Sequence, residues 1–178
     1  TLKAKSSDKA DIRIKIHDIN TGYESVQGFS IKSRLGGAST LVNAGKTTNF
    51  IYEITGNPTD DIAAEFESCS KLFKQKMAYL TSIGCGLRYV GMENDTFESN
   101  LLLIDGDLPQ ICAYMLTEYY STGANTVEKA LESIVVANPM KYNLSKGHPF
   151  YQYKFKKFLT ESALGMLPSK PWDGTADA

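Results

Sequence analysis

The sequence of 178 residues contains only three cysteines, and no two of them form a CxxC pair. An odd number at wide spacing (Cys69, Cys85 and Cys112) argues against a disulfide framework and against a zinc site. No apolar run approaches the roughly 20 residues that span a bilayer. The first residues also lack the apolar core of a signal peptide. These absences favour a reducing, cytoplasmic location and no membrane partner.

An excess of charge of either sign is missing as well. The chain has 19 Lys and Arg residues against 20 Asp and Glu residues, which leaves a net charge of -1 and a pI near 6.1. No global field therefore attracts the protein to nucleic acid or to an anionic membrane. Any DNA binding has to come from a local basic patch.

The length and the 42% of apolar residues allow one sizeable core. No repeat, low-complexity segment or linker divides the chain, so we predict a single domain over residues 1–178 with a helical part at 58–167. An initiator Met is missing and the last residues, PWDGTADA, supply no closing element. We therefore expect a fragment of a longer chain, truncated at both ends.

Residues 11–34 predict a two-stranded hairpin. The segment DIRIKIH alternates, with its isoleucines on one side, and Asn20-Thr21-Gly22 supplies a turn before the strand VQGFSIKS. With the turn centred between Thr21 and Gly22, the numbers of paired residues sum to 43. This register places Ile12 beside Ile31, Ile14 beside Phe29, Asp11 opposite Lys32 and Arg13 opposite Ser30, with the isoleucines on the buried side.

The rest of the chain predicts an α/β fold in which strands and helices are segregated. The predicted strands are 49–55, 87–90 and 98–105, and the predicted helices are 59–84, 108–121, 126–137 and 150–162.

A carboxylate beside a lysine on one strand pair suits phosphodiester hydrolysis. Asp11 can hold Mg²⁺ through oxygen, while the Lys32 ammonium orients water or stabilises the charged transition state. Such cross-strand pairs are also common on solvated sheets, where they have no catalytic role.

The stretch DI-RIKIHD…GFSIKS resembles the PD-(D/E)xK nuclease signature, in which an Asp opens one strand and an acid-x-Lys tripeptide lies on the next. The run GFSIKSRLGGASTLVNAGKTTNFIYEI and the segment YKFKKFLTESALGMLPSKPWDG are similar to the HpaII family of type II restriction endonucleases. The resemblance covers about residues 11–174. It implies a restriction-endonuclease-like mixed β-sheet flanked by helices, in a bacterial or archaeal cell.

The resemblance also implies the activity. It is Mg²⁺-dependent hydrolysis of double-stranded DNA at a short palindrome, CCGG for the namesake, by a type II site-specific deoxyribonuclease of a restriction-modification system. A palindromic target favours a homodimer. On this reading Asp11 takes the position of the metal-ligand Asp and Lys32 that of the catalytic Lys, while the Ile31 backbone carbonyl is a further metal ligand.

Ser30 departs from the pattern, because it stands where an acid is expected. Some nucleases with Ser-x-Lys recruit a carboxylate from elsewhere, and we favour Glu53 as a metal ligand and catalytic residue. Glu24 or a residue outside this chain are the alternatives, and Asp18 lies too far along the hairpin. The departure also supports a second hypothesis, a non-catalytic DNA-binding or interaction domain that keeps the nuclease fold. Cleavage of RNA or of structured DNA is a third.

Residues 35–48 are predicted to form an ordered loop, and its segment AGKTT at 44–48 resembles a phosphate loop, but position 40 is Thr where the Walker motif needs Gly. We expect instead a DNA-facing loop, with a solvated turn as the alternative. Its donors, together with Ser30, can bind phosphates or read base edges: Arg34, Thr40, Asn43, Lys46, Thr48 and Asn49.

Residues 149–159 mix lysines with aromatic residues. Basic residues among aromatics can grip nucleic acid. Aromatics at helical spacing more often pack in a core with the lysines pointing outwards, and we favour that interpretation here. His17 and His148 stand alone, and we assign neither a catalytic role.

Overall fold

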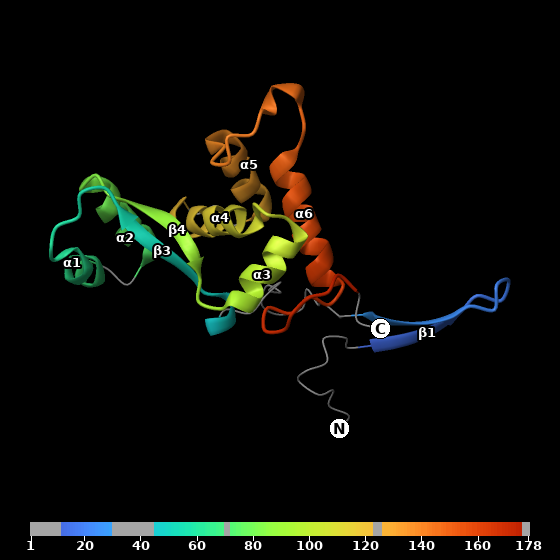
Figure 1. The fold of residues 1–178 in the computed structure, drawn as a ribbon. Coiled ribbons are helices and arrows are strands. Elements are labelled where there is room, and N and C mark those ends of the chain that lie inside the picture. Colours follow the sequence, from blue (N-terminus) through green and yellow to red (C-terminus); the bar gives the residue numbers. More distant parts are fainter. Residues whose placement is uncertain (1–11, 30–44, 70–71, 123–125, 176–178) are drawn as a thin grey trace.

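Two short β-ribbons and a group of helices make up the computed structural model, which describes residues 12–29, 45–69, 72–122 and 126–175 (Figure 1). The strands pair as β1 with β2 and as β3 with β4. Their bounds are Ile12–His17 (β1), Glu24–Phe29 (β2), Phe50–Thr55 (β3) and Gly86–Met92 (β4). The helices are Ile62–Cys69 (α1), Phe73–Ser82 (α2), Asp95–Ile104 (α3), Leu108–Thr122 (α4), Val127–Ala137 (α5) and Phe150–Ala163 (α6), with 3-10 turns at Lys46–Thr48 (η1) and Leu144–Lys146 (η2).

The hairpin of β1 and β2 forms as predicted, but its register is different. Ile12 lies opposite Phe29 and Ile14 opposite Gln27, so the paired numbers sum to 41 and the predicted sum of 43 is wrong. The loop explains the difference. The Asp18 amide donates to the Tyr23 carbonyl (2.9 Å), and Gly22, at φ 71°, takes the left-handed position at the end of the loop. The loop therefore centres one residue earlier.

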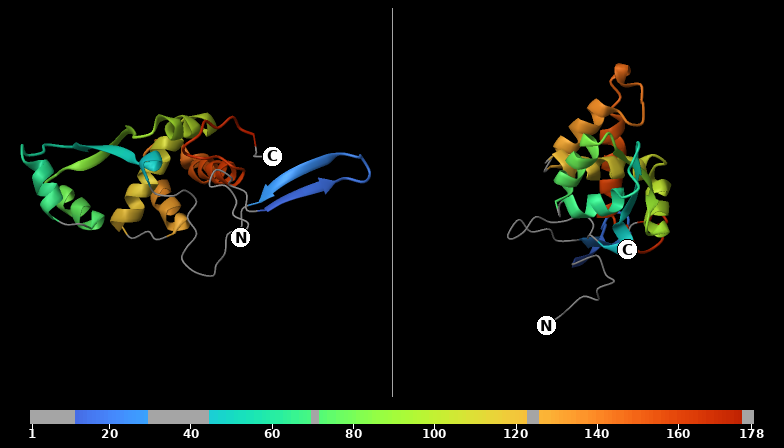
Figure 2. Two further views of the ribbon diagram at one scale, coloured as in Figure 1. Left: turned by 90° about the horizontal axis from the view of Figure 1, so that it is seen from below. Right: turned by 90° about the vertical axis from the view of Figure 1, so that its left-hand side faces the viewer.

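The faces of this hairpin survive the correction, because a shift of two residues keeps every side chain on its side. The predicted burial does not survive. Ile14 and Ile16 are each 48% exposed, and the hairpin projects from the helical body, away from the ribbon of β3 and β4 (Figures 1 and 2). Over the described residues, the predicted mixed sheet is thus two separate antiparallel pairs. The fold class is mixed α/β, and the restriction-endonuclease-like sheet stays a prediction.

The ribbon of β3 and β4 carries one face inwards, and both strands match their predicted positions. Phe50 and Tyr89 pack against the core with ring centroids 5.8 Å apart. The Tyr52 hydroxyl donates to the Ala113 carbonyl (2.8 Å) and so joins β3 to α4. The other face is open, with Ile51 and Val90 about half exposed.

The segment predicted as a strand at 98–105 is helix α3, so that prediction is wrong. The Asn94 side chain accepts a hydrogen bond from the Phe97 amide (3.0 Å) and caps the helix. Phe97 and Leu101 are buried four residues apart, whereas Leu102 and Leu103 are exposed. This is helical periodicity. The single helix predicted over 59–84 is likewise two helices, α1 and α2.

The core lies between α3, α4, α5 and α6, and the last three of these helices confirm their predictions. Its fully buried members include Leu101, Ile111, Ile134, Tyr151 and Met166. The aromatic residues of α6 contribute Tyr151, Phe155 and Phe158 to this core, while Lys156 and Lys157 are exposed. The prediction of core aromatics with outward lysines is confirmed for these residues, whereas Tyr153 is exposed and Lys154 forms an internal ion pair with Asp105. Among the described helices, none has the length and apolarity to cross a membrane.

Candidate functional site

Most of the predicted site residues lie outside the described residues. These are Asp11, Ser30, Ile31, Lys32, Arg34, Thr40 and Asn43. In the sequence, Asp11 and Ser30 directly adjoin Ile12 and Phe29, which form the last described pair of the hairpin at its open end. The predicted pairing of Asp11 with Lys32 falls outside the described residues, and the register from which it followed, with a sum of 43, is wrong for the described pairs.

The two other acids of the hairpin lie at its loop end. Glu24 faces His17 in the register and forms an ion pair with Lys15, whose Nζ is 2.5 Å from Glu24 Oε2. Glu24 is five strand residues from Phe29, which is about 17 Å at the usual rise. Asp18 accepts hydrogen bonds from the loop amides of Asn20 and Thr21, and these bonds lower its pKa. Both carboxylates are therefore engaged in contacts at the loop end of the hairpin.

Glu53 lies on β3, in the other ribbon, and its carboxylate is engaged. It forms an ion pair with Arg88 of β4, whose Nε is 3.2 Å from Glu53 Oε2. The two residues face each other across the strands, and both are more than half exposed. The structure does not bring Glu53 beside the hairpin, and a role as metal ligand would need Arg88 to give up this contact.

The end of the predicted DNA-facing loop is described from Gly45 onwards. Thr48 Oγ1 accepts from the Gly45 amide (3.2 Å) and donates to the Gly45 carbonyl (3.1 Å), which closes the turn η1. Asn49 Nδ2 donates to Glu93 Oε2 (2.8 Å). Lys46 is exposed. In this part of the chain, Lys46 thus points to solvent, whereas Thr48 and Asn49 make internal hydrogen bonds.

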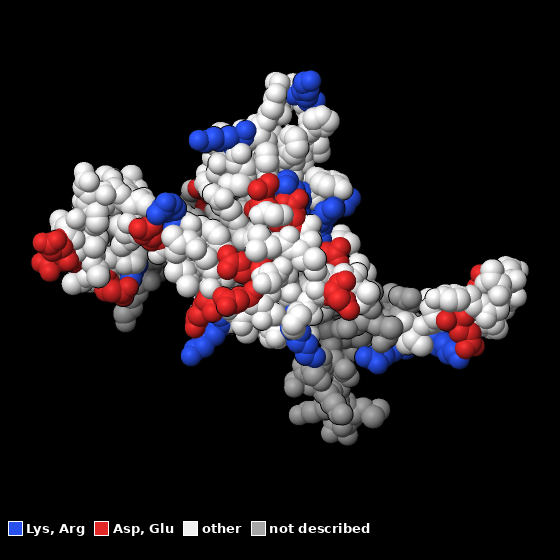
Figure 3. Space-filling model, viewed as in Figure 1, with Lys and Arg blue, Asp and Glu red and all other residues white. Residues whose placement is uncertain are grey.

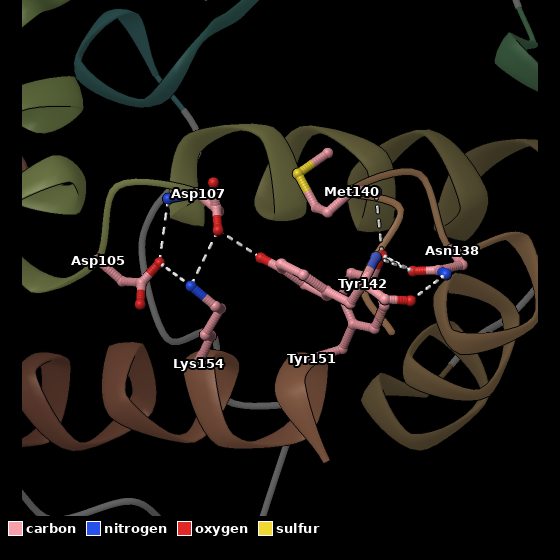
Figure 4. A network of polar contacts seen from close by, with 7 residues as sticks. All are labelled: Asp105, Asp107, Asn138, Met140, Tyr142, Tyr151 and Lys154. Atoms are coloured by element: carbon pink, nitrogen blue, oxygen red, sulfur yellow. Dashed lines mark hydrogen bonds and ion pairs between the residues drawn. The ribbon is translucent and has the colours of Figure 1, made fainter. Parts of the chain in front are cut away.

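A partly buried cluster of charges joins three segments that are distant in sequence (Figure 4). Lys154 Nζ of α6 is 2.6 Å from Asp105 Oδ1 and 2.9 Å from Asp107 Oδ2. The Tyr142 hydroxyl donates to Asp107 Oδ2. Burial disfavours the charge on Lys154, but the hydrogen bonds to the two carboxylates outweigh it and raise its pKa. The hydrogen bond from Tyr142 and that from Lys154 lower the pKa of Asp107.

The same network continues to the connection between α5 and α6. Asn138, the left-handed cap of α5, accepts hydrogen bonds at Oδ1 from the Tyr142 amide (3.0 Å) and from the Tyr151 hydroxyl (2.8 Å). The Tyr151 hydroxyl in turn accepts from the Met140 amide (3.0 Å). Burial raises the pKa of Tyr151. These contacts hold the backbone of residues 138–142 against α6.

The described cluster is not a metal centre. Lys154 occupies the space between the two carboxylates (Figure 4). Within residues 12–29, 45–69, 72–122 and 126–175, no group of three or more His, Cys, Asp or Glu side chains could hold a metal ion. An open groove of about 960 Å³ lies between β3, α4, α5 and α6, but its walls are mostly aromatic and aliphatic. Catalytic acids are therefore not gathered in the described part.

Comparison with known protein families decides what the chain is related to. The model of the HpaII restriction endonuclease family matches residues 1–178, the whole chain. The chain belongs to the HpaII restriction endonuclease family. The family predicted from the two sequence segments is thereby confirmed.

A curated relative of this HpaII-family chain is the type II restriction enzyme HpaII of Haemophilus parainfluenzae. The two are 43% identical over 177 residues, which cover 99% of this chain and 49% of the relative. The chain thus spans about half the length of the curated relative that it matches. No solved structure matches the chain.

Sequence reasoning missed the polar network of the HpaII-family chain. Asp105 and Asp107 follow α3 in the sequence IDGDL, and Lys154 lies 47 residues after Asp107. No local motif connects them, because the contact depends on how α6 packs beside the connection from α3 to α4. The acids of the DGD tripeptide were the only signal available.

Proposed function

We propose that this chain is the part of a type II restriction endonuclease that cleaves double-stranded DNA at a short palindrome, CCGG-like, by Mg²⁺-dependent hydrolysis of phosphodiester bonds. The observation that carries the proposal is the family match over residues 1–178, supported by 43% identity to the HpaII enzyme across 177 residues. Because the chain spans half of that relative, the proposal concerns the complete protein.

The catalytic roles follow the sequence pattern. Asp11 and the Ile31 carbonyl would hold Mg²⁺, with Glu53 as the candidate for the missing acid at Ser30. Lys32 would orient the attacking water or stabilise the charged phosphate. DNA contacts would come from Ser30 and from the loop that follows, at Arg34, Thr40, Asn43, Lys46, Thr48 and Asn49. Of the loop residues, Lys46 is the one whose described side chain is exposed and cationic.

The described residues do not complete a Mg²⁺ site by themselves. Glu53 is bound to Arg88, and the described part of the chain holds no group of three or more potential ligands. The proposed ion thus depends on Asp11 and on the carbonyl of Ile31. When bound, Mg²⁺ would supply charge neutralisation at the scissile phosphate.

Assembly as a homodimer on a palindrome and a location in the cytoplasm are parts of the same proposal.

Cleavage assays on the full-length protein test the proposal. Plasmid DNA with and without CCGG sites is incubated with Mg²⁺ or with EDTA. We expect site-dependent double-strand cleavage in Mg²⁺ only, and a loss on the order of 10²- to 10³-fold or more for Asp11→Asn and Lys32→Ala. Binding of DNA should largely survive in both variants. Lys74→Ala, at an exposed lysine of α2, is the matched control. Full cleavage by either catalytic variant contradicts the proposal.

Ser30 favours one alternative function, a DNA-binding domain that keeps this structure without catalysis. Calorimetric titration of the full-length protein with Mg²⁺, in the presence and absence of DNA, separates the two. Uptake of metal together with cleavage supports the endonuclease. The binding domain is supported if the protein binds DNA but takes up no metal and cleaves no substrate in a panel of DNA and RNA.

A further inference from the structure

The connection between α5 and α6 is a basic loop with an unusual backbone. Its residues 138–148 form the far end of the helical body, where α6 begins (Figure 1). We propose that this loop is a second contact to the phosphate backbone of double-stranded DNA, made by Lys141 and Lys146. The inference rests on the proposed function, because it names a further part of the same DNA-binding surface.

The charge of the loop is of one sign. Residues 138–149 contain Lys141, Lys146 and His148 but no Asp or Glu, in a chain whose net charge is -1. All three side chains are exposed. At the top of the space-filling view, Lys and Arg side chains have no acidic neighbour, whereas acidic groups are frequent over the rest of this face (Figure 3). The loop is therefore the kind of local basic patch that a protein with no positive net charge needs in order to bind DNA.

The two lysines differ from four cations of the described chain that already have a carboxylate partner. Lys15, Lys76, Arg88 and Lys154 each form an ion pair with a carboxylate. Among the described residues, no ion pair involves Lys141 or Lys146. Their charges do not have to leave an internal partner in order to contact a phosphate, so the gain on binding is not offset by a broken ion pair.

The backbone of the loop is strained at Lys141, the first of its two lysines. Lys141 has φ 56°, in the left-handed region, where the β-carbon of an L-residue is crowded. Asn138, at φ 43°, tolerates this region well and caps α5, but Lys does not. Strain of this kind persists only where the surroundings impose it, and it is concentrated at functional positions. A glycine at 141 would relieve the strain and lose the charge.

The surroundings that impose this conformation are rigid. Asn138 and the fully buried Tyr151 hold the backbone on both sides of Lys141, through Met140 and Tyr142. The Tyr142 ring stacks on Phe150 with centroids 4.7 Å apart, and its hydroxyl is bound to Asp107. These contacts fix the backbone at Lys141 before any partner arrives, which lowers the backbone entropy lost on binding.

The position of the loop is compatible with one duplex that also contacts the catalytic hairpin. Helix α6 leads from the loop towards the side of the body from which β1 and β2 project (Figures 1 and 2). Its 14 residues span about 21 Å at 1.5 Å per residue. This is less than one helical turn of DNA, about 34 Å. Lys156 and Lys157 are exposed along the same helix. DNA therefore fits this surface better than an acidic protein does. Membership of the family gives no reason to expect an acidic protein as a partner.

The test measures the binding of a CCGG duplex and of an unrelated duplex to the full-length protein in EDTA, by fluorescence anisotropy at several salt concentrations. We expect Lys141→Ala and Lys146→Ala each to weaken both complexes by about 3- to 10-fold. Each should also reduce the slope of log K against log salt by about 0.9. Lys141→Gly should match Lys141→Ala in affinity and keep the thermal stability of the wild type. Lys141→Arg should bind like the wild type, and Lys74→Ala is the control.

Two outcomes overturn the loop proposal. In the first, the wild type cleaves DNA and both alanine variants keep its affinity and its salt slope. This result contradicts the loop proposal and leaves the proposed function intact. The other is a failure of the wild type to bind any duplex, which contradicts both proposals. Weakened binding in the variants of a protein that binds DNA without cleaving it supports the loop and contradicts the endonuclease.

Discussion

Lys154 Nζ lies 2.6 Å from Asp105 Oδ1, although the two residues are 49 positions apart in the chain. The same ammonium contacts Asp107, which also accepts the hydroxyl of Tyr142 (Figure 4). One cation therefore connects the end of α3, the start of α4, the loop before α6 and α6 itself.

Removal of this cation should destabilise the helical body. Lys154→Met keeps the aliphatic stem but leaves two partly buried carboxylates beside each other, so we expect a loss of about 2 kcal/mol in the free energy of unfolding. Urea denaturation measures it. Lys156→Met, at an exposed position of the same helix, should change the stability by less than about 0.5 kcal/mol. Equal effects of the two substitutions contradict a stabilising role for the network.

The acid side of the network predicts a pH dependence. The pKa of Asp107 lies below its ordinary value in the folded protein because Tyr142 and Lys154 donate to the carboxylate. A depressed pKa contributes stability that is present above the unfolded pKa, near 3.9, and is lost as the pH falls through the folded value. The stability difference between the wild type and Asp107→Asn should therefore shrink below about pH 4. Urea titrations at pH 7, 5, 4 and 3 measure this, and a constant difference is the contrary result.

Glu53 and Arg88 allow the role of the candidate metal ligand to be separated from that of the ion pair. Glu53→Gln should raise the Mg²⁺ concentration needed for half-maximal cleavage, because a neutral amide binds Mg²⁺ less well than a carboxylate. Arg88→Gln breaks the same ion pair but keeps the carboxylate, so the Mg²⁺ requirement should not rise. The measurement is the cleavage rate against Mg²⁺ concentration. Identical curves for the two variants exclude Glu53 as a ligand.

The cysteines should differ widely in reactivity. Burial raises the pKa of the Cys112 thiol to about 12, whereas Cys69 is exposed. Only the thiolate reacts, so at pH 8 Cys112 should be modified about 10³-fold more slowly than an ordinary exposed thiol. A colorimetric thiol reagent should therefore modify Cys69 in a fast phase of the native protein, which Cys69→Ser removes, and should reach Cys112 only after denaturation. A fast phase whose amplitude is unchanged in Cys69→Ser contradicts this order.

Alternation predicted the faces of the hairpin but not its register. The isoleucines of β1 do share one side, because side chains alternate in any strand. The partner of each residue depends on where the loop turns, and that is decided by the backbone bonds of Asp18 and by the positive φ of Gly22. The burial of that face could not be predicted from its apolar character, since it depends on what packs there.

Helix α3 illustrates the limit for short apolar runs. The segment LLLI reads equally as a buried strand or as part of a helix, and the choice lies in the Asn94 cap and in the burial of Phe97 and Leu101. The candidate site divides in the same way. The family, and with it the proposed Asp11 and Lys32, followed from linear motifs, whereas the contacts of Lys154 and the strain at Lys141 are products of tertiary packing.

The hairpin of β1 and β2 has an energetic consequence that its sequence does not suggest. Over the described residues the two strands pair with each other alone, and Ile14 and Ile16 remain about half exposed. A two-stranded ribbon with so little buried surface is marginally stable in water. Its amide hydrogens should exchange through local opening at a cost far below that of global unfolding, while those of α4 and α6 exchange only with the whole body. Over the described residues, opening of the strands that lead to the proposed catalytic residues should therefore cost less free energy than unfolding of the helices. Binding of a duplex can then supply the free energy that orders these strands.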